Sequence, residues 1–419
     1  MAAALGVLVS CGSVKSGEEV VAASRDSKVV VAYVTSWSEV MPDPQYMTHI
    51  NYAFGHVNES FNGVKIDNEE RLRQIVDLRK QKPELKVLLS IGGWGSGRFS
   101  EMAANDEYRR AFAADCDRVV KEFALDGIDI DWEYPTSSMA NISSSPDDTE
   151  NFTLLMQDIR AAIGNEKELT LATVASARYI DFKAILPSVD FVNIMAYDMA
   201  SAPKHHSALY PSGHSGDITS DGAVTAHLKA GVPPSKLVMG MPFYGRGGDG
   251  YPSFQDYNKV GNTDTQYTEK WDEVAQVPYL ADKNDTLVFG FENPRSLAIK
   301  CQYILDKDLL GGMYWDYSGD NEQGDLRRTV AENLLGKPHK AKVLVLTERG
   351  GQHGGFTDAG LRWLAAEGAK GNFSITEINN ARNITEAYLS QFSLVIQLDF
   401  PPYTWPKEAE DAFVKYIEE

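Results

Sequence analysis

The chain has 419 residues, of which 43% are hydrophobic and 24% charged, and its formal net charge at pH 7 is -19. This composition predicts a globular protein with one large domain and a smaller unit. The negative charge repels phosphate backbones and anionic lipids, so it argues against nucleic acid and polybasic membrane docking, but not against a neutral polysaccharide. No run approaches the roughly 18 apolar residues that span a bilayer.

Residues 1–26 are predicted to form an export signal followed by a polar tether. The run MAAALGVLVSCGS contains LVSC, which resembles the lipobox of a bacterial lipoprotein with Cys11 as the lipidated residue. This interpretation predicts an exported protein, anchored by lipid to a bacterial membrane in the periplasm or at the cell surface. The alternative is a chance apolar N-terminus, because Met1 to Leu5 hold no Lys or Arg, where a secretory signal has its positive region.

Eight short apolar runs follow from Val29 onward, each succeeded by a helical pattern or a long connection. Nearly continuous apolar runs that alternate with helices indicate parallel strands covered on both faces, and their number suits closure into a (β/α)8 TIM barrel over residues 27–337. The runs are VVVAYVT, HINYAFGHV, KVLLSIGG, GIDIDWE, LTLATVA, FVNIMAYD, KLVMGMPFYG and GGMYWDY.

The fourth run carries three acidic residues two positions apart: Asp129, Asp131 and Glu133. Side chains alternate along a strand, so these carboxyls are expected on one face at about 6.5 Å spacing. Neighbouring carboxyls shift one another's pKa values, and residues with shifted pKa values are common at functional sites. The alternative, a solvated edge strand, is disfavoured because the intervening Ile and Trp residues need burial.

Polar and aromatic residues gather where the predicted strands end. In a parallel barrel these ends share one face, and chemistry takes place there. The residues at these ends are Tyr33, Trp37, Phe54, Ser90, Gly93, Trp94, Glu133, Tyr197, Asp198, Tyr244, Arg246 and Trp315.

The fourth run also fits the pattern DxxDxDxE, with Asp126, Asp129, Asp131 and Glu133 in the named positions, and so resembles glycoside hydrolase family 18. The elements SIGGW, MAYD, YVTSW, YAF and PFYGR match the same family from Val29 to roughly Gly336. Tyr134 and the proline after it resemble the chitinases more than the endo-β-N-acetylglucosaminidases of the same fold.

This resemblance implies a retaining, substrate-assisted mechanism in which the substrate's 2-acetamido oxygen attacks the anomeric carbon. Glu133 is then the general acid and base, and Asp131 holds the acetamido N–H and stabilises the oxazolinium ion. Asp129 shares a proton with Asp131, so the three carboxyls titrate as a coupled set. Tyr197 donates its hydroxyl to the attacking carbonyl oxygen.

The resemblance also implies which residues bind sugar. Trp315 forms an apolar floor, Trp37 and Trp94 are platforms for flanking sugars, and Asp198 and Arg246 form hydrogen bonds with the substrate. The other expected contacts are Tyr33, Phe54, Gly93, Tyr134, Met195 and Tyr244. Ser90 is expected to support Asp129 from behind, and Asp126 to be a structural turn residue.

The mechanism needs no cofactor, and no metal is expected. His205, His206 and His214, in the loop after the sixth strand, are predicted to be solvated rather than to bind metal. Cys116 and Cys301 are interpreted as small buried apolar residues and not as a disulfide.

Between the seventh and eighth strands, the connection from about Gly245 to Pro294 includes KWDEVAQVPYL and a strand-like run, TLVFGFE. It is shorter than the insertion of many chitinases, which predicts a lower wall, a shallower groove and endo action. Residues 341–419 restart the alternation with KVLVLT, FSITEI and LVIQLD. This unit resembles the ThuA-like (trehalose utilisation) family and is predicted to be an incomplete, flavodoxin-like, doubly wound segment of a truncated chain.

The leading hypothesis is an exported, monomeric glycosidase that cleaves β-1,4 links between N-acetylglucosamine units in chitin or chito-oligosaccharides. One alternative is an endo-β-N-acetylglucosaminidase that acts on the chitobiose core of N-glycans. Another is a non-catalytic, chitinase-like glycan-binding protein. The acid position is typically replaced in such binding proteins, whereas Glu133 is present here.

Overall fold

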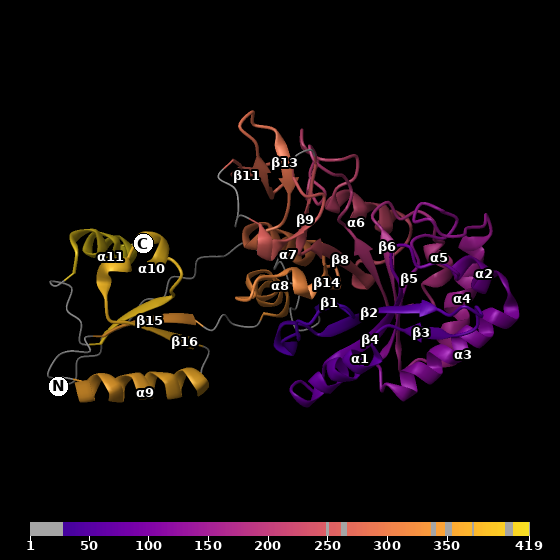
Figure 1. Cartoon of the computed structure of the whole chain (residues 1–419), viewed down its shortest axis with the longest axis horizontal. Helices are drawn as coiled ribbons and strands as arrows, with labels where there is room; N and C mark the ends of the chain where they lie inside the picture. Colours follow the sequence, from indigo (N-terminus) through magenta and orange to yellow (C-terminus); the bar gives the residue numbers. More distant parts are fainter. Residues whose placement is uncertain are drawn as a thin grey trace, which may run out of the picture.

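The computed structural model describes residues 28–248, 251–260, 266–336, 341–347, 354–370, 373–398 and 405–418. A large α/β barrel unit and a smaller C-terminal unit are seen in Figure 1. The predicted signal, with Cys11 and the polar tether, lies outside the described residues. Among the described helices, none combines the length and apolarity needed to cross a membrane.

The large unit is a closed barrel of parallel strands. The order β1-β14-β8-β7-β6-β5-β4-β2, with a further β1–β2 pairing, returns the sheet to its start, which confirms the predicted TIM barrel. A short strand, β3 (Val64–Ile66), pairs antiparallel with β2 at the edge of the sheet; the sequence analysis did not predict it. The barrel strands are β1 (Val29–Thr35), β2 (His49–Val57), β4 (Lys86–Gly92), β5 (Gly127–Asp131), β6 (Glu168–Val174), β7 (Phe191–Met195), β8 (Leu237–Pro242) and β14 (Gly311–Trp315).

Helices connect these strands around the outside of the barrel (Figure 1). Their ends follow local capping chemistry: Asn105 accepts hydrogen bonds from two backbone N–H groups of α3, and Asn293 with Ser296 forms a capping box at α7. The helices are α1 (Glu69–Val76), α2 (Phe99–Ala104), α3 (Asp106–Glu122), α4 (Asp148–Ile163), α5 (Phe182–Ile185), α6 (Ser220–Lys229), α7 (Pro294–Asp306) and α8 (Asp325–Leu335). Short 3-10 turns are η2 (Pro44–Tyr46), η3 (Asp77–Lys80), η4 (Pro234–Lys236), η5 (Tyr257–Lys259) and η6 (Tyr317–Gly319).

Strand β5 has an apolar face of isoleucines and a face that carries aspartates. Ile128 and Ile130 are fully buried in the core between the strands and the helices, whereas Asp129 and Asp131 alternate with them. Trp132, beyond the strand, is buried in a stack with Phe99 at 5.3 Å between ring centroids. Cys116 and Cys301 are both buried and free, as predicted.

The connection between β8 and β14 forms a second, five-stranded antiparallel sheet in the order β10-β9-β13-β12-β11. The sequence indicated only the strand that is β13 (Leu287–Gly290). The others are β9 (Tyr244–Gly247), β10 (Gln255–Asp256), β11 (Thr268–Asp272) and β12 (Val277–Ala281). Strands β9 and β10 were missed because they are very short, and β11 because it is polar; β12 is apolar, and its sequence was noted without being assigned to a strand.

The C-terminal unit contains a parallel sheet in the order β16-β15-β17, with β15 (Ala341–Thr347), β16 (Phe373–Ile378) and β17 (Leu394–Leu398). Val343 and Val345 pack with α9 (Gly354–Lys370), whereas Leu344 and Leu346 pack with α10 (Glu386–Leu389) and α11 (Lys407–Glu418). A turn, η7 (Ala381–Asn383), precedes α10. Helices therefore cover both faces, as in a doubly wound sheet, and the resemblance to the ThuA-like family stays a prediction.

A buried ion pair links α7 to the segment that precedes it, and its hydrogen bonds with Ser207 reach the loop after β7. Lys300 and Glu292 are 0% and 1% exposed, and the Lys300 ammonium donates to the Glu292 carboxylate and to the Ser207 carbonyl. The Ser207 hydroxyl donates to Glu292 Oε1 at 2.6 Å. Removal of one charge from such a pair leaves the other desolvated and unpaired.

We therefore expect Lys300→Met to lower the free energy of unfolding by about 3–5 kcal/mol, as loss of one member of a buried pair does. The double variant Lys300→Met, Glu292→Met should recover most of this loss. Lys270→Met, which breaks an exposed ion pair with Asp285, should leave the free energy of unfolding and the midpoint of thermal unfolding unchanged. Near-ultraviolet circular dichroism during heating measures all three, and a loss in Lys300→Met no larger than in Lys270→Met would contradict the expectation.

Candidate functional site

A cleft of about 740 Å³ opens at the carboxyl ends of the barrel strands. It brings together most of the residues predicted from the sequence, drawn from β1, β2, β5, β7, β14 and the inserted sheet. The predicted residues that line it are Tyr33, Trp37, Phe54, Trp94, Asp131, Glu133, Tyr134, Met195, Tyr197, Asp198, Tyr244, Arg246 and Trp315. Asp129, Ser90 and Gly93 are not among the lining residues.

Asp129 lies behind the cleft with no exposed surface. The Tyr33 and Ser90 hydroxyls each donate to its Oδ2 at 2.8 Å, so the predicted support from Ser90 is present. Its Oδ1 accepts from Thr170 Oγ1 at 2.6 Å and from Asn193 Nδ2 at 3.3 Å. Burial raises the pKa of Asp129, and these four hydrogen bonds oppose that rise.

Asp131 is 4% exposed, and its Oδ1 has no hydrogen-bond partner among the described residues. Burial raises the pKa of Asp131 well above its ordinary range, and the neighbouring charges of Glu133 and Asp129 raise it further. A carboxyl with two acidic neighbours and an unpaired oxygen is suited to hold a proton or to accept a donor from a ligand.

Strand β5 ends at Asp131, so Glu133 is not part of the strand that the sequence predicted to hold all three carboxyls. The spacing argument was wrong at that position, yet Glu133 still lines the same cleft. Burial raises the pKa of Glu133 to about 7; a hydrogen bond with Tyr134 opposes the rise, and the charge of Asp198 adds to it. A carboxyl with this pKa can both donate and accept a proton near neutral pH.

Two consecutive glycines shape the wall beside Asp131. Gly92 has a φ of +132°, and a Cβ there would lie 2.0 Å from the Asp131 carbonyl oxygen. Gly93 donates its N–H to that same oxygen at 2.9 Å, and a Cβ on Gly93 would lie 2.7 Å from the Phe54 ring. Gly93 therefore positions its neighbours, and its predicted contact with a ligand stays a prediction.

Arg246, in β9, forms two hydrogen bonds of 2.6 Å with the two carboxylate oxygens of Asp198. The buried His206 ring places Nδ1 3.4 Å from Asp198 Oδ1. Burial acts to raise the pKa of Asp198, but the hydrogen bonds from Arg246 and His206 outweigh it, so the net pKa is lowered. Asp198 is therefore a permanent anion next to Glu133.

Tyr197 also borders the carboxyls. Burial raises its pKa well above the ordinary range, and the charges of Asp131, Asp198 and Glu133 reinforce the shift. The hydroxyl of Tyr197 is therefore neutral at every physiological pH and retains a proton to donate. Its only hydrogen-bond contact among the described residues is a weak one to Met313 Sδ at 3.9 Å.

Aromatic rings surround the carboxyls. Trp315 lies 5.6 Å from both Tyr33 and Phe54 between ring centroids, and stacks on Phe54 with an interplanar angle of 21°. Trp37 and Trp94 remain 63% and 61% exposed, although each has ring neighbours in the cleft. Large exposed aromatic faces at a cleft are suited to pack against apolar ligand faces, including those of sugar rings.

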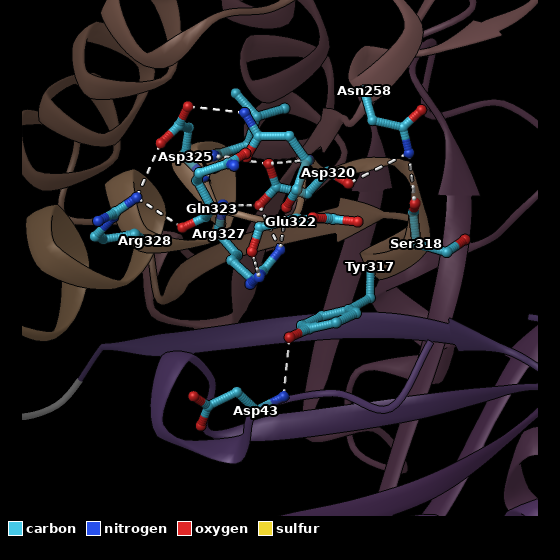
Figure 2. A network of polar contacts seen from close by, with 12 residues as sticks. Asp43, Asn258, Tyr317, Ser318, Asp320, Glu322, Gln323, Asp325, Arg327 and Arg328 are labelled. Atoms are coloured by element: carbon cyan, nitrogen blue, oxygen red, sulfur yellow. Dashed lines mark hydrogen bonds and ion pairs between the residues drawn. The ribbon is translucent and has the colours of Figure 1, made fainter. Parts of the chain in front are cut away.

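The segment after β14 is tied to two other loops (Figure 2). The Tyr317 hydroxyl accepts a hydrogen bond from Asp43 N at 2.9 Å, and Asn258 Nδ2 donates to the Asp320 carbonyl at 3.4 Å. The Asp320 carboxylate accepts from Arg327 N at 2.9 Å. These bonds connect the loop after β1 and the inserted sheet to the strand that ends in Trp315.

The sequence did not identify every residue of the cleft. Tyr179 stacks on Tyr134 at 5.5 Å, and Phe254 stacks on Tyr244 at 4.7 Å. Tyr179 follows the end of β6, so its position was an available signal. The other missed lining residues are Met139, Ala172, Val174, Ala175, Ser176, Arg178, Met199 and Ile218, most of which carry no chemical signal in the sequence.

The histidines of the loop after β7 are not all solvated, contrary to prediction. His205 and His206 are 1% and 0% exposed, whereas the His214 side chain is 50% exposed. The inserted sheet covers them: the Tyr279 ring lies 5.4 Å from the His205 ring, and Tyr244 lies 5.4 Å from His206. The prediction failed because the sequence did not reveal this sheet.

The family model of the Glycosyl hydrolases family 18 matches residues 29–320. The chain is 30% identical to Chitinase A1 of Niallia circulans over 72% of this chain, and it covers 58% of that protein. It is 31% identical to Chitotriosidase-1 of Mus musculus, over 70% of this chain and 74% of that protein.

Among solved structures, a glycoside hydrolase family 18 N-acetylglucosaminidase from Paenibacillus barengoltzii is similar, with 32% identity and a TM-score of 0.68. That match covers 73% of this chain and 99% of the other. The chitinase ChiA74 of Bacillus thuringiensis matches with 26% identity and a TM-score of 0.68, over 74% of this chain and 70% of the other.

The raised pKa of Glu133 has a consequence for stability. Its ordinary value is 4.5, and its value in the fold is about 7, so the folded state binds this proton more tightly than the unfolded state. Its contribution to stability is therefore full at low pH and declines as the pH rises from about 4.5 to about 7. The variant Glu133→Gln has no such loss.

We expect Glu133→Gln to raise the midpoint of thermal unfolding above pH 7 by at least about 2 °C, and the gain to shrink toward pH 5. Glu84→Gln, at an exposed position, is the matched control and should follow wild type at every pH. Differential scanning calorimetry from pH 5 to 8 measures the difference. A gain that is constant with pH would show that the titration of Glu133 does not cause it.

Proposed function

The chain belongs to glycosyl hydrolase family 18, and from this membership we propose that it hydrolyses β-1,4 links between N-acetylglucosamine units in chitin or chito-oligosaccharides. The observation that carries the proposal is Glu133, a carboxyl with a pKa of about 7 in an aromatic cleft, next to the buried carboxyl of Asp131. Acid–base catalysis at neutral pH requires such a group.

In the first step, Glu133 protonates the glycosidic oxygen while the substrate's own acetamido oxygen attacks the anomeric carbon. The bond to the leaving sugar breaks, and a cyclic oxazolinium ion forms. In the second step, Glu133 accepts a proton from water, which opens the ring and leaves the anomeric configuration retained. No protein atom becomes covalently bound to the sugar.

The buried pair behind Glu133 supports the charge that develops. Asp131, whose Oδ1 is unpaired, accepts the acetamido N–H and faces the positive oxazolinium ion. As Asp131 becomes anionic, its proton passes toward Asp129, which the four donors described above hold in place. Asp131 can therefore become anionic without releasing a proton to bulk water. The site stays desolvated, so the attraction between Asp131 and the oxazolinium ion stays strong.

The remaining walls orient the sugar. Tyr197 stays protonated and donates a hydrogen bond to the acetamido oxygen. Trp315 lies under the apolar face of the reacting ring. The Asp198–Arg246 pair presents fixed charges to sugar hydroxyls. Trp37 and Trp94 extend the contact to neighbouring sugars, because their faces remain open to solvent.

A second candidate is release of single N-acetylglucosamine units. It is favoured by the similarity to the Paenibacillus barengoltzii N-acetylglucosaminidase, which this chain covers over 99% of its length. The expected endo action and the activity on N-glycan cores are further alternatives that use the same acid. A purely glycan-binding role is disfavoured because Glu133 and Asp131 lie together in the cleft.

We further infer that the enzyme acts outside the cytoplasm. The support is the lipobox-like LVSC in the sequence and the polymeric nature of the proposed substrate. Lipidation at Cys11 and a monomeric state remain predictions. Incorporation of radiolabelled palmitate into wild type, and its loss in Cys11→Ala, tests the anchor; no incorporation in wild type would refute it.

The activity is tested by product analysis after incubation with chitohexaose and, separately, with a high-mannose glycopeptide. We expect wild type to cleave chitohexaose and Glu133→Gln to lose at least about a thousandfold in rate, as loss of a general acid implies. Products of two or more sugars indicate internal cleavage, and monomer alone supports the second candidate. Cleavage of the glycopeptide alone would contradict the chitin assignment, and binding without cleavage would contradict an enzyme.

The pH profile of kcat/KM tests the role of Glu133 as an acid. The free enzyme must hold the Glu133 proton, and its pKa is about 7, so kcat/KM should fall about tenfold per pH unit above that value. Glu84→Gln should give the same profile as wild type. A profile that stays flat up to pH 9 would contradict the assignment of Glu133 as the acid.

A further inference from the structure

The loop after β7 and strand β11 of the inserted sheet bring two imidazoles and a carboxylate together outside the cleft. His205 and His214 come from the loop, and Asp272 ends β11. Each residue can offer one ligand atom, and these atoms lie within 4.8 Å of one another. None of the three lines the cleft described above.

We propose that His205, His214 and Asp272 bind a divalent transition metal of the zinc class. His205 Nε2 lies 3.1 Å from Asp272 Oδ2, and His214 Nδ1 lies 3.7 Å from the same oxygen. Two ligand atoms of a tetrahedral zinc ion, each about 2.1 Å from the metal, lie about 3.4 Å apart. The two distances bracket that separation, and all three ligand atoms lie within 4.8 Å of one another, so the site closes around a metal when the two imidazoles move toward it.

The side chains are in a suitable state to act as ligands. The His205 ring is 1% exposed, and its Nδ1 has no hydrogen-bond partner among the described residues. Its Nε2 is the nitrogen that contacts Asp272 Oδ2, and a bound metal replaces that hydrogen bond.

Asp272 is held in place by other bonds. Its Oδ1 accepts from the backbone N–H groups of Val274 and Ala275, each at 2.9 Å, and Ser212 Oγ donates to Oδ2 at 2.8 Å. The carboxylate therefore remains oriented toward the histidines when no metal is bound. Metal sites commonly fix their ligands with such contacts from surrounding groups.

The ligand set selects the metal. Two imidazoles and one carboxylate suit zinc and neighbouring transition metals, whereas calcium and magnesium prefer oxygen ligands only. The half-exposed His214 gives the ion access from solvent and leaves a fourth position for water. A bound ion joins the loop to the inserted sheet, and the adjacent His206 contacts Asp198 in the cleft. The role is therefore to brace one wall of the cleft, with no part in bond cleavage.

The test uses the full chain without a polyhistidine tag, freed of metal with EDTA and then dialysed into buffer without chelator. Zinc content after incubation with zinc chloride is measured by inductively coupled plasma mass spectrometry, and affinity by isothermal titration calorimetry. We expect one zinc ion per chain and a higher midpoint of thermal unfolding with zinc, because a ligand of the folded state stabilises it. Calcium and magnesium should produce no shift.

Two variants and a control locate the site. His214→Ala, at a half-exposed position, should keep the fold and weaken zinc binding at least tenfold, about 1.4 kcal/mol. Asp272→Asn keeps an acceptor for the backbone N–H groups and should weaken binding to a similar degree. His56→Ala removes a histidine outside the cluster, one that contacts Ser96 and Asp67, and should bind zinc as wild type does. Wild type without bound zinc, or variants that bind it with unchanged affinity, would overturn the proposal.

Discussion

Desolvation of the carboxyl groups of Asp129, Asp131 and Glu133 is the constraint on which the rest of the site depends. An acidic side chain removed from water prefers to be neutral, and the charges of Glu133 and Asp129 increase that preference at Asp131. The barrel offsets this cost at Asp129 with four hydrogen-bond donors. Asp131, whose Oδ1 has no hydrogen-bond partner among the described residues, is instead favoured in its neutral form. Glu133 holds its proton near neutral pH because burial and the charge of Asp198 raise its pKa to about 7.

Much of this arrangement follows from sequence pattern alone. Nearly continuous apolar runs predicted all eight barrel strands, because parallel strands covered on both faces leave little room for polar residues. Alternation within GIDID placed the isoleucines of β5 in the core and its two aspartates together on the other face. The position of residues at strand ends then predicted ten of the residues that line the cleft, and the carboxylate spacing and the family resemblance added Asp131, Tyr134 and Met195.

The failures have physical causes too. The sequence analysis assumed that side chains alternate between faces as far as Glu133, but β5 ends at Asp131. The apolar Trp132 that follows gave no sign that the strand ends there. The inserted sheet was largely missed because β9 and β10 are very short and β11 is polar. Burial of His205 and His206 depends on this sheet, so their environment was inaccessible to sequence reasoning.

The central claim is that burial among carboxyls gives Glu133 a pKa near neutrality. An infrared difference titration of wild type against Glu133→Gln, from pH 3 to 9, isolates the signal of this one carboxyl. The account predicts a midpoint at about 7 for loss of the Glu133 proton. A midpoint near 4.5, the ordinary value of a glutamate, would contradict it, because the barrel would then not perturb the group that the proposed mechanism uses as its acid.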